Sequence, residues 1–218
     1  MKRLLNTLVV VIAICALSTA AFAGTQATNT NTVSPTLQIS ATIQKAVQLT
    51  LSTGTAAIAS HCAVAPGGNP PDYTMDFGNV DALGINAGNC NKFAPATPGT
   101  SNAVYWSDYN LTPIYTSQSG TSASSITAYV STNFANGNIG IVRSSTANSS
   151  AIPAGVASFA NMSTAVGAQD TIANAADMTA AGNGGTLTRF IGVSVAPTNG
   201  AGLAGATSAT VTFTMTIN

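Results

Sequence analysis

Charged side chains are scarce in this chain of 218 residues, at 6% of the total, where globular proteins usually have about a quarter. Glutamate is absent, and six aspartates stand against six basic residues. Without basic stripes we expect no nucleic-acid partner, and without glutamate an EF-hand calcium loop cannot form. Hydrophobic residues make up 45% of the chain, which excludes a disordered composition. The polar surface must then consist of Thr, Ser, Asn and Gln, which suits a protein that packs against copies of itself.

Histidine is almost absent as well, because His61 is the only one. Catalysis by a nucleophile and a base, in the manner of a serine or cysteine hydrolase, therefore lacks its usual imidazole partner. The aspartates near one another flank turns, where such residues commonly form the turn rather than a glycosidase pair. A metal site at His61 and Cys62 would lack third and fourth ligands at a recognisable spacing. We expect no enzyme activity, no cofactor and no metal, with His61 exposed on a loop.

A hydrophobic run long enough to span a membrane is also missing. The apolar stretch at residues 8–17 has about ten residues, where a spanning helix needs about twenty. Lys2 and Arg3 precede it and Ala21-Phe22-Ala23 follows it, a pattern typical of a secretory signal peptide over residues 1–23. We therefore expect a chain that is exported through the periplasm, begins at Gly24 and has no membrane span after signal removal.

Cysteine is rare, and only Cys62 and Cys90 follow the expected signal peptide. In an oxidising compartment an isolated pair is expected to form a disulfide. The loop that it closes has about 28 residues, for which the loop-entropy model gives about 3–4 kcal/mol of stabilisation.

What the chain does contain is strict polar and apolar alternation near both of its ends. Alternation places every second side chain on one face of a strand. The C-terminal strand presents Val211, Phe213, Met215 and Ile217 opposite four threonines. The N-terminal alternation covers 37–43 and resumes over 46–52, with a bend near Lys45. Its first segment presents Leu37, Ile39, Ala41 and Ile43.

Between these ends, short alternating or β-branched stretches predict many strands and no sustained helix. Residues 66–71 are too rich in Pro and Gly for regular structure. The pattern is weakest at 144–186, which we interpret as a helix-containing insertion or a long loop, with helical spacing at Phe159, Met162 and Val166. The sequence therefore predicts a β-sandwich over residues 45–218, with further strands at 73–80, 103–115 (in one or two pieces around Pro113), 126–130, 139–142 and 187–195.

Several short motifs follow one another along the chain, namely Leu49-Thr50-Leu51-Ser52-Thr53-Gly54, the cysteine Cys62, Met75-Asp76-Phe77-Gly78-Asn79-Val80 and Phe190-Ile191-Gly192-Val193. Their order resembles the spore coat protein U family, whose members include subunits of chaperone–usher pili. The resemblance covers about 37–90 and 187–218. Two features depart from the family pattern: the chain has no terminal aromatic residue, and Gly205-Ala206-Thr207 replaces the usual Gly-x-Tyr.

The resemblance implies an all-β, immunoglobulin-like sandwich of the pilin type that lacks one strand. A periplasmic chaperone would fill the gap until the N-terminal extension of the next subunit replaces it at an outer-membrane usher. Residues 24–44 would be that extension, with Leu37, Ile39, Ala41 and Ile43 as the donor strand. The acceptor groove would include Val211, Phe213, Met215 and Ile217. The product would be a cell-surface fibre made of this chain or related pilin subunits, with a role in adhesion or biofilm.

Three alternatives remain open from the sequence. Residues 37–43 could pair within their own subunit as an ordinary first strand, or the more polar 25–35 could be the donor. The chain could instead be a monomeric, secreted or surface-bound β-sandwich that binds carbohydrate as an adhesin. Aromatic and acidic side chains that are typical of sugar sites would then form its ligand surface, namely Tyr105, Trp106, Asp108 and Tyr109. Against this, the same aromatic side chains could simply fill the core.

Overall fold

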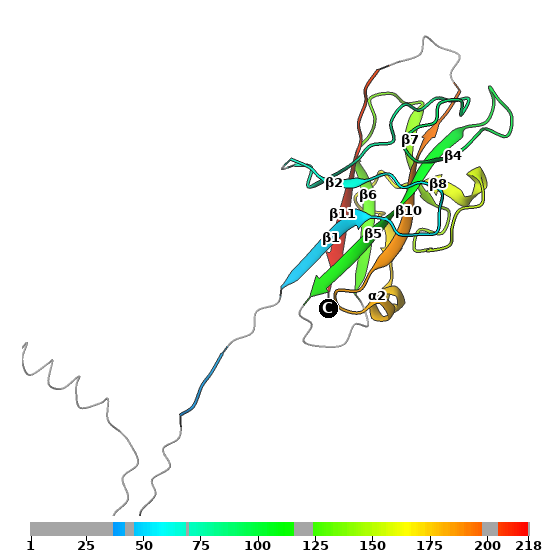
Figure 1. The fold of residues 1–218 in the computed structure, drawn as a ribbon. Helices are drawn as coiled ribbons and strands as arrows, with labels where there is room; N and C mark the ends of the chain where they lie inside the picture. The colour runs from blue at the N-terminus through cyan, green and yellow to red at the C-terminus, as the bar shows by residue number, and fades with distance from the viewer. Residues whose placement is uncertain (1–36, 42–45, 69, 116–123, 198–204, 218) are drawn as a thin grey trace, which may run out of the picture. The chain divides into compact units, whose positions relative to one another are not determined.

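The computed structural model describes residues 37–41, 46–68, 70–115, 124–197 and 205–217. It falls into two units, residues 1–43 and residues 44–218. The regular elements of the second unit are almost all strands (Figure 1). In chain order its elements are β1 (Val47–Thr53), β2 (Val64–Pro66), β3 (Tyr73–Met75), β4 (Asn91–Phe93), β5 (Ala103–Tyr115), β6 (Ser125–Thr132), β7 (Ile139–Ser144), the 3-10 turn η2 (Val156–Ser158), β8 (Phe159–Asn161), β9 (Asp170–Ala173), α2 (Ala175–Ala181), β10 (Leu187–Val195) and β11 (Thr210–Thr216).

The strands form two main sheets and one small hairpin. The larger sheet has the order β1-β5-β10-β7-β8, and β4 pairs with the same edge of the long strand β5 beyond the end of β1. The smaller sheet has the order β11-β6-β9, and β2 pairs with β3 as a separate hairpin. All of these pairings are antiparallel.

The hydrophobic core lies between the two sheets, so the arrangement is a sandwich. Strand alternation turns one face of each sheet inward, and Leu51, Leu111 and Leu187 lie in one row across β1, β5 and β10. From the smaller sheet, Ile126 and Ile172 pack into the same cluster. Burying side chains of this size contributes about 1.5–3 kcal/mol each, which makes this cluster the main stabilising element of the fold.

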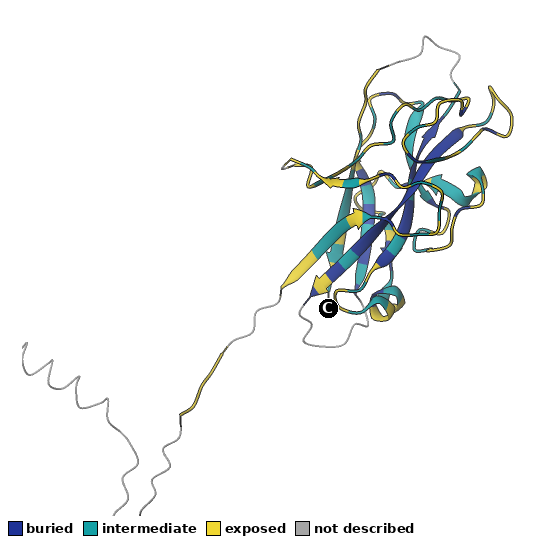
Figure 2. Ribbon diagram, viewed as in Figure 1, coloured by how far each residue is buried: buried dark blue, intermediate teal, exposed yellow. Residues whose placement is uncertain are grey.

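The outer face of the larger sheet is covered as well. Trp106 on β5 stacks on Phe93, with ring centroids 5.3 Å apart, and meets Phe190 edge-on at 5.9 Å. Ile58 and Phe159 pack against the same cluster from loops and from β8. With both faces covered, β5 is buried along almost its whole length, as Figure 2 shows.

One edge of the sandwich is closed by polar links between the sheets. Arg143 on β7 pairs with Asp170 on β9, with 2.5 Å between Nη2 and Oδ1, and the other Asp170 oxygen accepts from the Ser163 amide at 2.7 Å. Arg189 on β10 donates from Nε to the Ile172 carbonyl at 2.6 Å. We call β7, β8, residues 162–163 and β9, together with Arg189 of β10, the closed edge.

Burial and ion pairing shift the pKa values of the charged groups at the closed edge in opposite directions. Burial raises the pKa of Asp170, but the bonds from Arg143 and from the Ser163 amide outweigh it and hold the pKa below its ordinary value. Burial lowers the pKa of Arg189, against the opposing effect of Asp177. The Arg189–Asp177 contact, 3.3 Å between Nη2 and Oδ2, is an ion pair without hydrogen-bond geometry.

Several elements differ from the sequence-based expectation. Strand β5 runs unbroken through Pro113, because the Pro113 carbonyl bonds to the Gly184 amide and its nitrogen therefore faces away from β1. The stretch 73–80 is a strand only over Tyr73–Met75. The helical spacing at 159–166 is wrong, since Phe159–Asn161 is β8 and the helix lies at Ala175–Ala181. Asn174 and Asp177 start that helix with a reciprocal capping box.

The N-terminal unit is described only at residues 37–41, which belong to no strand. The side chains of Leu37 and Ile39 are each 84% exposed. Ile43, the stretch 25–35 and the expected signal peptide lie outside the described residues. Within the part of the chain that the structure describes, no helix is long and apolar enough to cross a bilayer.

Candidate functional site

An apolar groove lies between the first and the last strand of the sandwich. It has a volume of about 420 Å³. We call it the β1–β11 groove. Its described lining comes from β1, from β11, from the segment around the β2–β3 hairpin and from three strands beneath, and consists of Leu49, Leu51, Val64, Pro70–Phe77 without Asp76, Tyr109, Ile141, Ile191 and Ala209–Phe213.

The two long walls of the groove follow from strand alternation. Leu49 and Leu51 on β1 share the inward parity, as do Val211 and Phe213 on β11. These four side chains are only partly buried, although they pack against the central core. Side chains of this type are usually buried fully in a sandwich, so the groove leaves apolar surface without its usual cover.

The floor of the groove includes one buried aromatic side chain. Tyr109 on β5 is 2% exposed and meets Phe213 edge-on, with ring centroids 5.7 Å apart. Burial raises the pKa of Tyr109, against a smaller opposing effect of the Arg189 guanidinium, so the phenol stays neutral. Among the described lining residues Asp72 is the only one with a charged side chain. An uncharged, apolar guest therefore fits this lining best.

The backbone edges beside the groove are also without a partner strand. Within the described residues, β1 pairs only with β5 and β11 pairs only with β6. Each of the two strands therefore has a second edge whose N–H and C=O groups are available for pairing. The groove combines apolar pockets with two free strand edges, and this is the chemistry that recognises an extended peptide.

The predicted acceptor residues divide into two pairs. Val211 and Phe213 line the groove. Met215 and Ile217 lie further along the same face of the chain and pack against the central core outside the groove lining. Of the predicted donor residues, Leu37 and Ile39 are highly exposed, and Ala41 lies in the same strand-free stretch.

Most of the groove was missed by sequence reasoning, which predicted only Val211 and Phe213 among its described lining residues. The alternation of Leu49 and Leu51 predicted a strand but carried no signal that its inner face would lack a partner. Tyr73 and Met75 belong to a three-residue strand that was expected to be longer, and Pro70 and Pro71 to a plain loop. Only the packing of this segment against β1 makes it a wall of the groove.

The carbohydrate surface considered from the sequence is wrong, because all four of its residues are buried. Tyr105, Trp106, Asp108 and Tyr109 are between 0% and 5% exposed. They alternate between the two faces of β5, so they do not form one platform. The aromatic rings instead fill the core clusters on both sides of the larger sheet.

His61 is exposed, as the sequence indicated, but its ring is not free. Its Nδ1 lies 2.6 Å from Oδ1 of Asp108, and the other Asp108 oxygen accepts from the Ala56 amide at 2.7 Å. Because Asp108 is fully buried, the two bonds satisfy a carboxylate that would otherwise be costly. The pair anchors the loop after β1. No cluster of three or more His, Cys, Asp or Glu side chains suited to a metal occurs in the described ranges.

Comparison with known proteins yields no match of the chain to a family model, to a curated protein or to a solved structure.

Proposed function

We propose that this chain is the structural subunit of an extracellular fibre and that it polymerises by donor-strand complementation. The observation that carries the proposal is the β1–β11 groove, an apolar channel flanked by two strand edges that have no second partner among the described residues. In this proposal the sandwich is of the immunoglobulin-like pilin type and is completed by a strand from another molecule. The fibre would stand on the cell surface and serve adhesion or biofilm formation.

The guest that we assign to the groove is residues 37–43 of a second copy. Leu37 and Ile39 are each 84% exposed in a stretch that belongs to no strand. The segment carries no charge, in keeping with a groove whose described lining has one charged side chain. Its apolar residues recur at every second position, which is the spacing of side chains on one face of a strand.

The expected energy of docking is large for so short a segment. Each Leu or Ile that becomes fully buried contributes about 1.5–3 kcal/mol, and the backbone of the guest gains ladder hydrogen bonds with β1 and β11. A chain with such an open groove needs protection before assembly. We therefore propose a periplasmic chaperone that fills the groove for a time and an outer-membrane usher at which the subunits exchange strands.

The test is electrophoresis of the exported protein with and without boiling, for the parent chain and for two matched variants. Ile39→Asp places a charge on the face that would enter the groove, whereas Gln38→Asp places the same charge on the opposite face. We expect a boiling-sensitive ladder of polymers for the parent and for Gln38→Asp. Ile39→Asp should give folded monomer only, because a carboxylate in an apolar pocket costs several kcal/mol.

Other outcomes would contradict the donor assignment. A ladder that persists in Ile39→Asp means that residues 37–43 are not the donor. If the ladder is instead lost in Val33→Asp, the donor lies in 25–35. A single monomer band for the parent at every concentration would overturn the proposed fibre and leave a monomeric binding protein.

A further inference from the structure

The segment from Val64 to Phe77 forms one wall of the groove, and we call it the hairpin wall. It includes β2 and β3 and supplies eight of the eighteen described lining residues. The width of the groove on this side therefore depends on where the hairpin wall stands. A guest strand can dock with full affinity only if the wall is already in place, since ordering a wall during binding costs free energy.

The hairpin wall has little internal structure to hold it there. β2 and β3 pair over three residues each, and an isolated two-stranded hairpin is marginal in water. Its direct hydrogen bond to β1 runs from the Val64 amide to Oγ1 of Thr53, at 2.9 Å. The outward residues Ala65, Pro66 and Thr74 are exposed. Val64 and Met75 also pack against the central core, and the position of the rest of the wall depends on its two ends.

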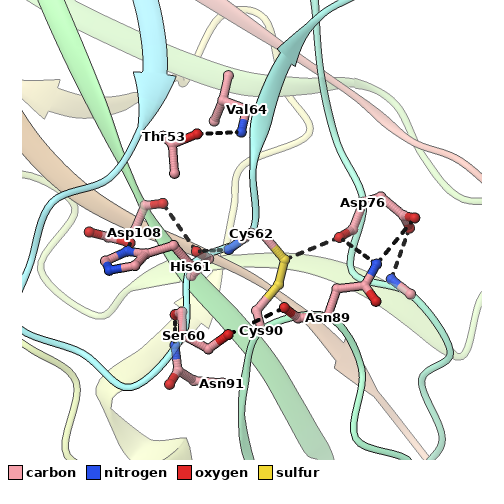
Figure 3. The surroundings of a disulfide bond; sticks show 12 residues. Thr53, Ser60, His61, Cys62, Val64, Asp76, Asn89, Cys90, Asn91 and Asp108 are labelled. Atoms are coloured by element: carbon pink, nitrogen blue, oxygen red, sulfur yellow. Dashed lines mark hydrogen bonds and ion pairs between the residues drawn. A yellow bond between two sulfur atoms is a disulfide. The ribbon is translucent and has the colours of Figure 1, made fainter.

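The two ends of the hairpin wall are fastened to two neighbouring residues, the first end to Cys90 and the second end to Asn89, as Figure 3 shows. Before β2, Cys62 forms a disulfide with Cys90, and its amide donates to Oγ of Ser107 on β5 at 2.9 Å. Both cysteines are buried, at 1% and 9% exposure. Because Cys90 directly precedes β4, which pairs with β5, the disulfide ties the start of the wall to the larger sheet.

After β3, Asp76 fastens the other end. The side chain of Asn89 donates from Nδ2 to the Asp76 carboxylate at 3.2 Å and to the Asp76 backbone carbonyl at 3.3 Å. The backbone amide of Asn89 donates to the Phe77 carbonyl at 3.0 Å. The turn needs Gly78, whose φ is +68° and whose missing Cβ leaves room for the Asn89 side chain. The Cys62 sulfur also lies 3.1 Å from the Asp76 carbonyl oxygen, so the disulfide and the Asp76–Asn89 contact are next to each other.

We infer that Cys62, Cys90 and Asn89 are positioning residues for the groove: they hold the hairpin wall at the distance from β1 and β11 that a guest strand requires. The subunit then accepts a donor strand at full affinity only when its disulfide is formed. The inference rests on the proposed function for the identity of the guest, but the fastening of the wall can be tested without it.

The first experiment measures the affinity of a fluorescent peptide with the sequence of residues 35–45 for the full exported chain, in the Ile39→Asp background that leaves the groove free. The variants are Cys62→Ala with Cys90→Ala, and Asn89→Ala. The matched control is Asn86→Ala, since Asn86 is an exposed residue of the same loop that takes part in the fold through its backbone. All are measured well below their melting temperatures, with folding checked by near-UV circular dichroism.

We expect both wall variants to bind the peptide about tenfold or more weakly while they remain folded, because the wall must be ordered on binding. The Asn86→Ala control should bind as the parent does. A purely global role of the disulfide would lower the melting temperature and leave the affinity of the folded protein unchanged. Equal affinities would thus overturn the inference and leave the proposed function intact.

Hydrogen exchange provides the second, peptide-independent measurement. In Asn89→Ala, amides of β2 and β3 should exchange about tenfold or more faster than in Asn86→Ala, with β5 and β10 equally protected in both. Equal exchange in the two variants would overturn the inference. If the parent fails to bind the peptide, the proposed guest is wrong, and hydrogen exchange alone decides whether the wall is fastened in this way.

Discussion

The two edges of this sandwich differ in whether the space between the two sheets is closed by the chain itself. At the closed edge the chain passes from β8 to β9, and Arg143 with Asp170 and Arg189 with the Ile172 carbonyl link the sheets. At the other edge, β1 and β11 stand apart across an apolar groove. Both β9 and β11 pair with β6, so the contrast does not come from the smaller sheet. The contrast depends on whether residues of the same chain bridge the two sheets at that edge.

The contrast also separates stability from assembly. Partly buried ion pairs and hydrogen bonds to carbonyl groups at the closed edge serve the fold and are already satisfied within the subunit. Half-buried side chains at the groove contribute less to the isolated subunit and would gain their full burial from a guest. Substitutions at the two edges should therefore have different consequences.

The largest difference is expected between Ile172→Ala on β9 and Val211→Ala on β11. Ile172 is 1% exposed, and its truncation should lower the free energy of unfolding by about 2–5 kcal/mol through lost burial and a new cavity. Val211 is only partly buried, so its truncation should cost about 1 kcal/mol or less in the monomer. Urea unfolding of both variants in the monomeric Ile39→Asp background measures the difference. Similar losses would show that the groove side is packed as tightly as the closed edge.

A middle-sized effect is expected when a link between the sheets is removed. Arg189→Ala leaves the Ile172 carbonyl without its donor and Asp177 without its ion pair, which should cost about 2–4 kcal/mol. Thr214→Ala, on the exposed face of β11, should stay within about 0.5 kcal/mol of the parent. Thermal unfolding of the same monomeric background provides the comparison. An Arg189→Ala variant as stable as the control would mean that packing alone closes this edge.

The smallest effect is a pH dependence at the closed edge. The pKa of Asp170 is held below its ordinary value of 3.8, so the folded state binds this proton less tightly than the unfolded state. Its contribution to stability is present above that ordinary value and is lost as the pH falls through the lowered pKa. As the pH is lowered from about 6 to about 3, the midpoint of thermal unfolding should fall less steeply in Arg143→Ala than in the parent. Parallel curves would show that the pair does not set the acid sensitivity.

Local patterns predicted the strands whose environment is regular. The boundaries of β10 were expected at 187–195, as the structure has them, because both of its neighbours are strands and its side chains are buried. The alternation at 210–217 likewise became β11. The disulfide between Cys62 and Cys90 is present, as the isolated cysteine pair indicated.

Where the prediction failed, a distant contact decides the local structure. Pro113 does not break β5, because its carbonyl accepts a hydrogen bond from the Gly184 amide, about seventy residues later in the chain. The short strands β4 and β9 have three and four residues, too few for a periodic signal. Phe159 joins an aromatic cluster with Trp106 and Phe93, and this packing overrides the weak helical spacing around it.

Local sequence patterns were enough to predict which strand faces are apolar, where the chain can turn, and that one cysteine pair follows the expected signal peptide. These properties depend on neighbours within a few residues. The tertiary structure alone shows that the inner faces of β1 and β11 meet across a groove, that the hairpin wall lies beside them, and that polar contacts link the two sheets at the closed edge. β1 and β11 lie more than a hundred positions apart in the chain, and no local periodicity specifies that they meet.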